Sequence, residues 1–89
     1  MFEPLEPLEF CEKWVPKKKG VTPDRRNYRK ACAELLAELT GNKEESVRQW
    51  LFAPDRVPLL VKRYLRVVDR LWQLEELFDK AFDIFKNKS

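Results

Sequence analysis

The stretch LLAELTGNKEESVRQWL, residues 35–51, decides the fold. It contains two helical patterns on either side of Gly41, a residue type that adopts the left-handed conformation found where many helices end. Before this glycine, Ala37 is small enough to let a second helix cross closely. After it, Val47 and Trp50 lie one helical turn apart, so both side chains face the same way. The stretch therefore predicts two short helices that cross steeply and are joined by a tight turn.

This arrangement resembles the helix-turn-helix of the Cro/phage-repressor-like (XRE) superfamily. The resemblance continues through VRQWLFAPDRVPLLVKRYL, residues 47–65, where that family packs a further helix behind the motif, and it covers about residues 30–71. It implies sequence-specific binding of duplex DNA, with the second helix of the motif in the major groove. The chain departs from the family at Asn42, where an apolar residue is usual, and at Lys43, where serine or threonine is usual. The family's separate first helix is either missing here or supplied by residues 4–15.

The second helix of the motif, the recognition helix, supplies the residues that the resemblance places against base edges. Arg48 and Gln49 carry suitable groups, because arginine pairs bidentately with guanine and glutamine with adenine. The base-contacting candidates are Lys43, Glu44, Ser46, Arg48 and Gln49.

Two acidic residues open the recognition helix, where a DNA-binding surface would favour positive charge. Asn42 is a candidate N-cap, which places Glu45 at the third helical position and predicts a capping box. For Glu44 three interpretations stay open: it accepts a hydrogen bond from cytosine, it repels phosphate and so sharpens selectivity, or it faces a basic protein.

Charge is unevenly distributed along the 89-residue chain, whose net charge is +3. Residues 1–16 are acidic, whereas residues 17–30 are strongly basic. Such a basic block is a candidate contact for the DNA backbone, and its alternative interpretation is a solvated loop and helix face. The phosphate-contact candidates are Lys17, Lys18, Lys19, Arg25, Arg26, Arg29, Lys62 and Arg63.

The remaining sequence patterns are also helical, and no region alternates in the manner of a strand. An amphipathic helix is predicted over residues 4–15, followed by a linker, PKKKGV. Thr22 and Pro23 form a helix-start signal, which predicts one continuous helix from there to Thr40. We expect one all-α domain, a helix-turn-helix bundle of four to five helices with a long C-terminal helix. Its segments are an acidic N-terminal helix with a basic linker (1–21), the helix-turn-helix (22–52) and the long helix (57–87).

The long helix carries two rows of apolar residues and contains no glycine or proline. One row has steps of four and three, a heptad pattern typical of coiled coils. It comprises Leu60, Tyr64, Val67, Leu71, Leu74, Phe78, Ala81 and Phe85. The second row comprises Val61, Leu65, Val68, Trp72 and Phe82.

The predicted length of this helix is ~43 Å, which exceeds the reach of a compact domain of this size. One end must overhang, and its apolar residues need a cover, which is either the helix at 4–15 or a second subunit. We therefore expect a homodimer. The dimer-interface candidates are Leu74, Leu77, Phe78, Ala81, Phe82 and Phe85.

The composition excludes several classes of function. The chain has no histidine and two cysteines far apart in sequence, so it offers no zinc cluster, and it lacks a glycine-rich phosphate loop. We expect no enzyme activity, no metal and no cofactor. The acidic N-terminus differs from a signal peptide, and no stretch approaches the roughly 18 apolar residues of a membrane span, so a cytoplasmic location without membrane contact is expected.

Together these patterns predict a small dimeric transcriptional regulator of the repressor type that binds double-stranded DNA. The alternative is a protein-interaction module on the same fold, with a protein partner. Such a module would be antitoxin-like, or an adaptor that binds a polymerase or a defence complex.

Overall fold

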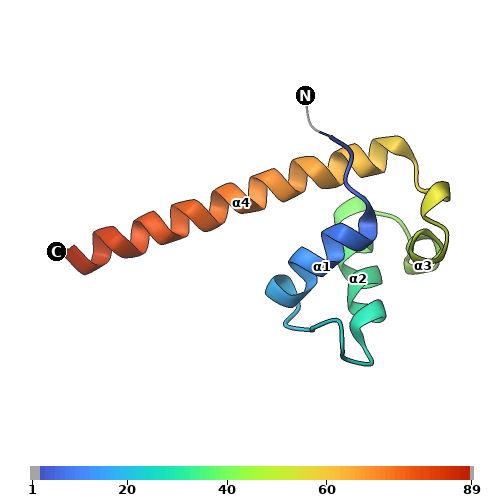
Figure 1. Ribbon diagram of the computed structural model, residues 1–89, viewed down its shortest axis with the longest axis horizontal. Coiled ribbons are helices and arrows are strands. Elements are labelled where there is room, and N and C mark those ends of the chain that lie inside the picture. The colour runs from blue at the N-terminus through green and yellow to red at the C-terminus, as the bar shows by residue number, and fades with distance from the viewer. Residues whose placement is uncertain (1–2, 89) are drawn as a thin grey trace.

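A computed structural model describes residues 3–88, with the side chains of residues 3–86. Within these residues the chain forms four α-helices, one 3-10 helix and no strand, which confirms the all-α class. The elements are α1 (Pro7–Lys18), α2 (Tyr28–Thr40), α3 (Glu44–Phe52), the 3-10 helix η1 (Pro54–Arg56) and α4 (Leu59–Lys88). Figure 1 shows α1, α2 and α3 gathered beside the N-terminal half of α4, while its C-terminal half projects away from them.

The hydrophobic core lies where α1, α2 and α3 meet the N-terminal half of α4. Each of the four α-helices contributes at least one large side chain with almost no exposed surface. These are Phe10, Trp14, Leu36, Val47 and Leu65. The rings of Phe10 and Trp14 also pack on Trp72, with centroid separations of 5.6 and 5.1 Å. This aromatic cluster fixes α1 against α4.

The first helix begins later than the predicted residues 4–15. Pro7 occupies its first turn, where the missing N–H costs no helical hydrogen bond. The preceding Leu5 is buried outside the helix, and its backbone N–H donates to the carbonyl of Lys62 in α4 at 3.0 Å. This hydrogen bond holds the residues before Pro7 in an extended segment against α4, so they do not join the helix.

The first helix also ends later than predicted, so the linker assigned from PKKKGV is wrong for its first three residues. Pro16 lies inside the helix and removes only one backbone donor near its end. The ammonium of Lys17 lies 4.9 Å from the ring centroid of Trp14, and that of Lys18 lies 4.5 Å from Trp72. These cation–π contacts hold both lysines in the helical conformation.

The predicted start of the second helix at Thr22 is wrong, since α2 begins at Tyr28. The Thr22 hydroxyl donates to the carboxylate of Asp24, and the Thr22 carbonyl accepts the N–H of Arg25 at 3.0 Å. A second turn follows, closed by the N–H of Tyr28 and the carbonyl of Arg25 at 3.2 Å. Because Thr22 is used within these turns, it does not cap a helix, and the basic residues before Tyr28 lie in a loop.

The turn between α2 and α3 is confirmed at Gly41, which has a φ of 74° and donates its N–H to the Ala37 carbonyl at 2.9 Å. The predicted capping box is wrong. The N-cap of α3 is Lys43, not Asn42, and its side chain makes no capping hydrogen bond. Glu45 therefore stands at the second helical position, one residue too early for the reciprocal bond.

The long helix α4 presents the second apolar row, and not the heptad row, to the core. Leu65 and Val68 are 0% and 6% exposed, whereas Leu60 and Phe85 of the heptad row are 79% and 77% exposed. The projecting half extends the molecule to 50 × 35 × 20 Å, and its radius of gyration of 14.9 Å exceeds the ~12 Å expected for a compact domain. Nowhere in the described residues does a helix combine the length and the apolar character that a membrane crossing needs.

Of the two covers expected for the projecting half of α4, the one by the first helix is wrong. The ion pair of Lys17 with Glu76 at 3.0 Å joins the end of α1 to α4, and the large apolar side chains beyond Glu76 are exposed. The reason is length, because α1 ends at Lys18 beside the middle of α4.

A buried carboxylate joins α1 to α4. Asp69 has no exposed surface, and it accepts hydrogen bonds from the indole Nε1 of Trp14 at 2.8 Å and from Arg66 at 3.2 Å. The ammonium of Lys13 lies 2.8 Å from the same carboxylate. Burial by itself raises the pKa of Asp69, but the hydrogen bonds from Lys13 and Trp14 and the charge of Lys13 outweigh burial and hold that pKa below its ordinary value. Arg66, one turn before Asp69 in α4, is the arginine that pairs with this carboxylate.

The two cysteines, far apart in sequence, are neighbours in the core. Cys11 of α1 and Cys32 of α2 are both buried free thiols. The hydrogen bond to Cys32, together with burial, raises the pKa of Cys11. The same hydrogen bond lowers the pKa of Cys32, so the two thiols form a polar contact between α1 and α2.

Candidate nucleic-acid interface

The candidate interface is the outer surface of α3 together with the N-terminal end of α2, here named the α2–α3 face. Val47 is fully buried and anchors α3 to the core. Its polar neighbours therefore point outward. All five base-contacting candidates, Lys43, Glu44, Ser46, Arg48 and Gln49, are exposed. Figure 1 views α3 nearly end-on while α2 lies in the plane of the picture, so the two helices cross steeply, as the sequence predicted.

The two helices bring basic residues together at one point of this face. Arg29 and Lys30 of α2 and Arg48 of α3 line a surface pocket of about 220 Å³, together with Leu51 and Phe52. The guanidinium carbon of Arg29 lies 5.3 Å from the ring centroid of Phe52, which is 73% exposed. A phosphate-contact candidate and a base-contacting candidate therefore lie side by side, although they are distant in sequence.

Two exposed residues of this pocket, Lys30 and Phe52, were not among the candidates identified from the sequence. A signal for both existed. Phe52 follows Arg48 by four residues in α3, and this spacing places the two side chains on one face of a helix. Lys30 follows Arg29 in the same first turn of α2.

Glu44, the acidic residue that sequence patterns left open, has a partner within α3. Its carboxylate lies 3.9 Å from the guanidinium of Arg48, one helical turn later. Both side chains are about half exposed, and such a pair contributes little to stability. The pair places a negative charge beside the guanidinium of Arg48.

The basic residues at the end of α1 are engaged elsewhere. Among Lys17–Lys19, the first pairs with Glu76, the second lies over Trp72, and the third pairs with Glu38 at 2.8 Å. Hydrogen bonding to Glu38 raises the pKa of Lys19. In Figure 1 this end of α1 points away from α3. Of the phosphate-contact candidates, Arg29 lies on the α2–α3 face, and Arg25 and Arg26 are exposed in the turns that lead into α2.

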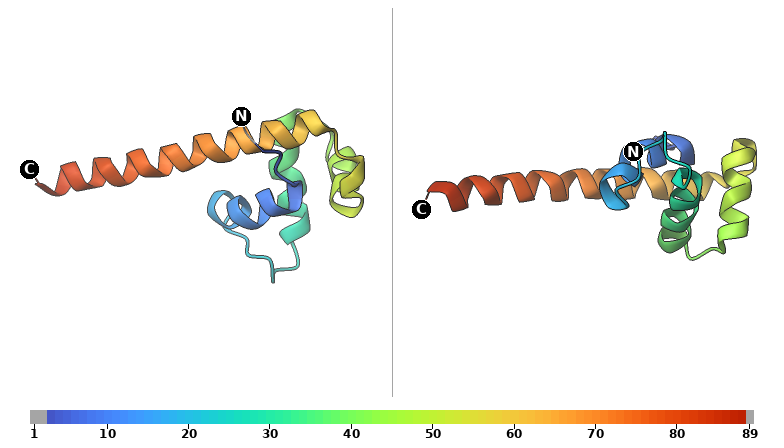
Figure 2. Two further views of the ribbon diagram at one scale, coloured as in Figure 1. Left: turned by 45° about the horizontal axis from the view of Figure 1, so that its top comes forward. Right: turned by 90° about the horizontal axis from the view of Figure 1, so that it is seen from below.

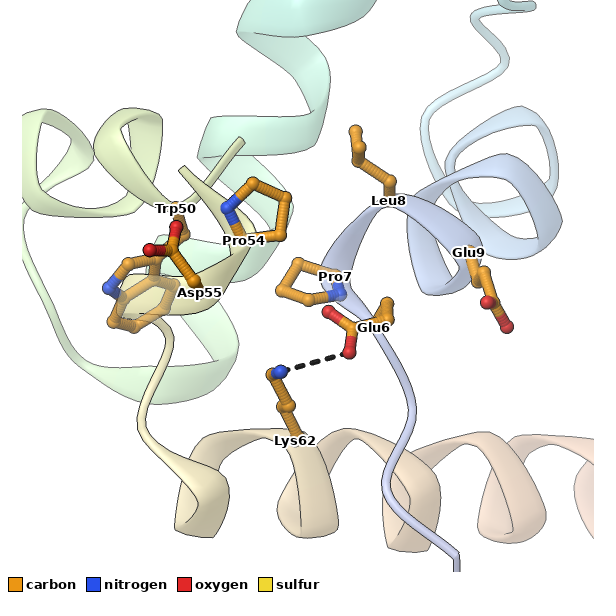
Figure 3. Close-up of a pocket in the computed structure, with 8 residues that line it drawn as sticks. All are labelled: Glu6, Pro7, Leu8, Glu9, Trp50, Pro54, Asp55 and Lys62. Carbon is orange, nitrogen blue, oxygen red and sulfur yellow. Dashed lines mark ion pairs between the residues drawn. The ribbon is translucent and has the colours of Figure 1, made fainter. Parts of the chain in front are cut away.

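A larger pocket, of about 470 Å³, lies between α1, the end of α3 and α4. Figure 3 shows Lys62 reaching from α4 to the carboxylate of Glu6, with which it pairs at 2.9 Å. The other oxygen of Glu6 is inaccessible and has no hydrogen-bond partner. Because the other charged groups that line it belong to Glu9 and Asp55, this pocket repels phosphate, and Lys62 is not available as a backbone contact. The last phosphate-contact candidate, Arg63, is exposed on α4.

No group of three or more potential ligands within the described part of the chain is arranged to hold a metal ion. The chain matches no protein family, no curated protein and no solved structure. What the chain does is therefore inferred from its own residues.

Proposed function

We propose that this protein binds duplex DNA through its α2–α3 face and acts as a small transcriptional regulator of the repressor type. The observation that carries the proposal is the convergence of Arg29 and Lys30 with Arg48 around one exposed pocket. A short, exposed helix with basic groups beside it has the shape and charge that fit a major groove and its flanking phosphates.

Each part of the face then has a role. Arg48 and Gln49 contact base edges, with Ser46 nearby on the same helix and Lys43 at its N-cap. Arg25, Arg26 and Arg29 contact phosphates, which adds affinity without sequence information.

The acidic residues at the start of α3 are compatible with these roles. Both Glu44 and Glu45 lie in the first turn of α3, where the helix dipole stabilises negative charge. Releasing Arg48 from Glu44 to a guanine costs only an exposed ion pair, roughly 0.3–0.5 kcal/mol. Glu44 thus disfavours nonspecific phosphate contact while leaving Arg48 free to engage a base.

The first test is a salt series with random-sequence duplex DNA. The logarithm of the binding constant should fall linearly with the logarithm of salt concentration, with a slope of about −0.9 for each phosphate contact. The double variant Arg25→Ala, Arg29→Ala should reduce the magnitude of this slope by about 2. A matched control, Lys80→Ala on the exposed projecting part of α4, should leave the slope unchanged.

Two outcomes would count against the proposal: no binding at about 50 mM salt, or an unchanged slope in the double variant. The first outcome, with the fold intact, would favour the second candidate function, a protein-interaction module. The observation behind that candidate is the exposed ring of Phe52 stacked on Arg29, since aromatic and arginine side chains anchor many protein interfaces. Such a module would be antitoxin-like, or an adaptor that binds a polymerase or a defence complex.

A further inference from the structure

The projecting half of α4 carries an exposed apolar stripe, here named the α4 seam, formed by Leu71, Leu74, Phe78, Ala81 and Phe85. Among them, Leu74 is 51% exposed and Phe78 is 72% exposed. Figures 1 and 2 show this half of α4 from several directions with no other element beside it. Contiguous apolar surface of this extent marks a contact site.

We propose that the α4 seam pairs with the same seam of a second copy in a parallel, in-register coiled coil. This proposal rests on the proposed function, because it assigns the surface that joins two copies of the regulator. The heptad assignment follows from the steps of four and three. Leu71, Phe78 and Phe85 take position a, and Leu74 and Ala81 take position d.

Charges beside the seam favour the parallel orientation. In a parallel coiled coil, the g residue of one helix faces the e residue five positions later on its partner. Arg70 stands at g and Glu75 stands at e, and both are exposed. Arg70 therefore meets Glu75 of the partner subunit, and the two-fold axis repeats the ion pair. An antiparallel pair places g against g and e against e, which separates these opposite charges.

The next heptad repeats the match with apolar residues. Leu77 stands at g and Phe82 at e, 62% and 66% exposed, so the parallel arrangement pairs Leu77 with Phe82 of the partner subunit. Ala81, small and at position d, leaves space between the layers of Phe78 and Phe85. This alternation of large and small residues lets the phenyl rings of both copies pack in one core.

The size of the seam suits a stable dimer. A phenylalanine buries roughly 150–250 Å² when covered, so Phe78, Phe82 and Phe85, each 66–77% exposed, still offer on the order of 100 Å² each. With Leu71, Leu74 and Leu77, which are 51–62% exposed, the total is on the order of 600 Å² per copy, above the roughly 500 Å² per partner that a specific interface needs.

The placement of α3 agrees with the same orientation. In Figure 1, α3 lies at the end of the molecule opposite to the C-terminus of α4. A parallel pair keeps both α3 helices at one end, where they can meet a single duplex with two-fold symmetry. An antiparallel pair separates them by the length of the coil.

The association is tested by sedimentation equilibrium of the full chain in the absence of DNA. The native chain should have twice the 10.7 kDa mass of one copy. Phe78→Lys places a charge in the seam of each of the two copies. We expect it to raise the dimer dissociation constant more than about a hundredfold. Phe52→Lys changes an exposed phenylalanine outside the seam and should leave the dimer intact. A monomeric native chain, or a Phe78→Lys variant that still dimerises, would overturn the proposal.

The orientation is tested with two separate single variants, Leu74→Cys and Ala81→Cys, oxidised in air. In a parallel, in-register pair both positions face their own copies across the two-fold axis, so both variants should cross-link. An antiparallel pair can bring at most one of them together, and that result would overturn the proposed orientation. Asp79→Cys, outside the seam, should stay uncross-linked, as should the native chain, whose two thiols are buried. Because no DNA is used, failure here is distinct from failure of DNA binding.

Discussion

Replacing Asp69 by alanine is expected to lower the free energy of unfolding by about 2–3 kcal/mol at neutral pH, measured by urea denaturation. The substitution leaves the buried indole N–H of Trp14 without an acceptor, and an unsatisfied buried donor costs about 1–3 kcal/mol. It also removes the counter-charge of Lys13 and Arg66. These two side chains are 38% and 21% exposed, so water offsets part of their loss.

Two variants make the Asp69 prediction specific. Asp69→Asn keeps an acceptor for Trp14 but loses the negative charge, so it should destabilise the fold less than alanine does. Asp79→Ala removes an exposed aspartate from the same helix and should change stability by less than about 0.5 kcal/mol. If Asp69→Ala were as stable as Asp79→Ala, the contact of Asp69 with Trp14 would not stabilise the junction of α1 with α4.

The same carboxylate makes the free energy of unfolding depend on pH, and stability falls as the pH is lowered. The pKa of Asp69 in the folded chain lies below its ordinary value of 3.8. Its ionised form therefore stabilises the fold above pH about 4, and that contribution is lost as the pH falls through the lower, folded pKa. Acid titration should bring the stability of the native chain toward that of Asp69→Asn below pH about 4.

The second large effect is expected in DNA selectivity. The double variant Arg48→Ala, Gln49→Ala should lose about a hundredfold or more in preference for a selected site over random duplex, because each bidentate base contact contributes about 1–3 kcal/mol of discrimination. The site is first obtained by selecting the native chain's ligands from a random library. Competition binding between the selected and random duplexes then measures the preference.

Glu45→Gln is the matched control for selectivity, since it also alters an exposed residue of α3 that is not a base-contacting candidate. It should raise affinity for both duplexes and leave their ratio unchanged. If the double variant keeps the native preference, then bases are not contacted by Arg48 and Gln49.

The elements with a long or simple pattern could be predicted from sequence. The heptad and helical steps of α4 predict one long, unbroken helix, and Gly41 predicts the turn, because each depends on local geometry alone. The start of α2 could not be predicted, since the polar groups of Thr22 can form hydrogen bonds either within a turn or as a helix cap. In the structure Thr22 forms the turn with Asp24 and Arg25 and caps no helix.

Tertiary contacts account for the other differences. Both apolar rows of α4 have a helical period, and which row faces the core depends on where α1 places Trp14, opposite Asp69. In the same way, Lys17 and Lys19 form ion pairs with glutamates on other helices. The sequence alone does not show these partners, so it includes both lysines among the phosphate-contact candidates. Within the candidate site, exposure of the α3 residues followed from the pattern around Val47, whereas the contact of Arg29 with Phe52 required the fold.

The central claim, that the α2–α3 face is the surface that contacts DNA, is tested most directly by mapping that surface. The backbone amide resonances of the isotope-labelled native chain are followed while the selected duplex is added. Shifts concentrated in α3 and in residues 25–30, with little change over residues 74–86, are the predicted result. Shifts confined to α4 or to the pocket around Glu6, with α3 unchanged, would contradict the account.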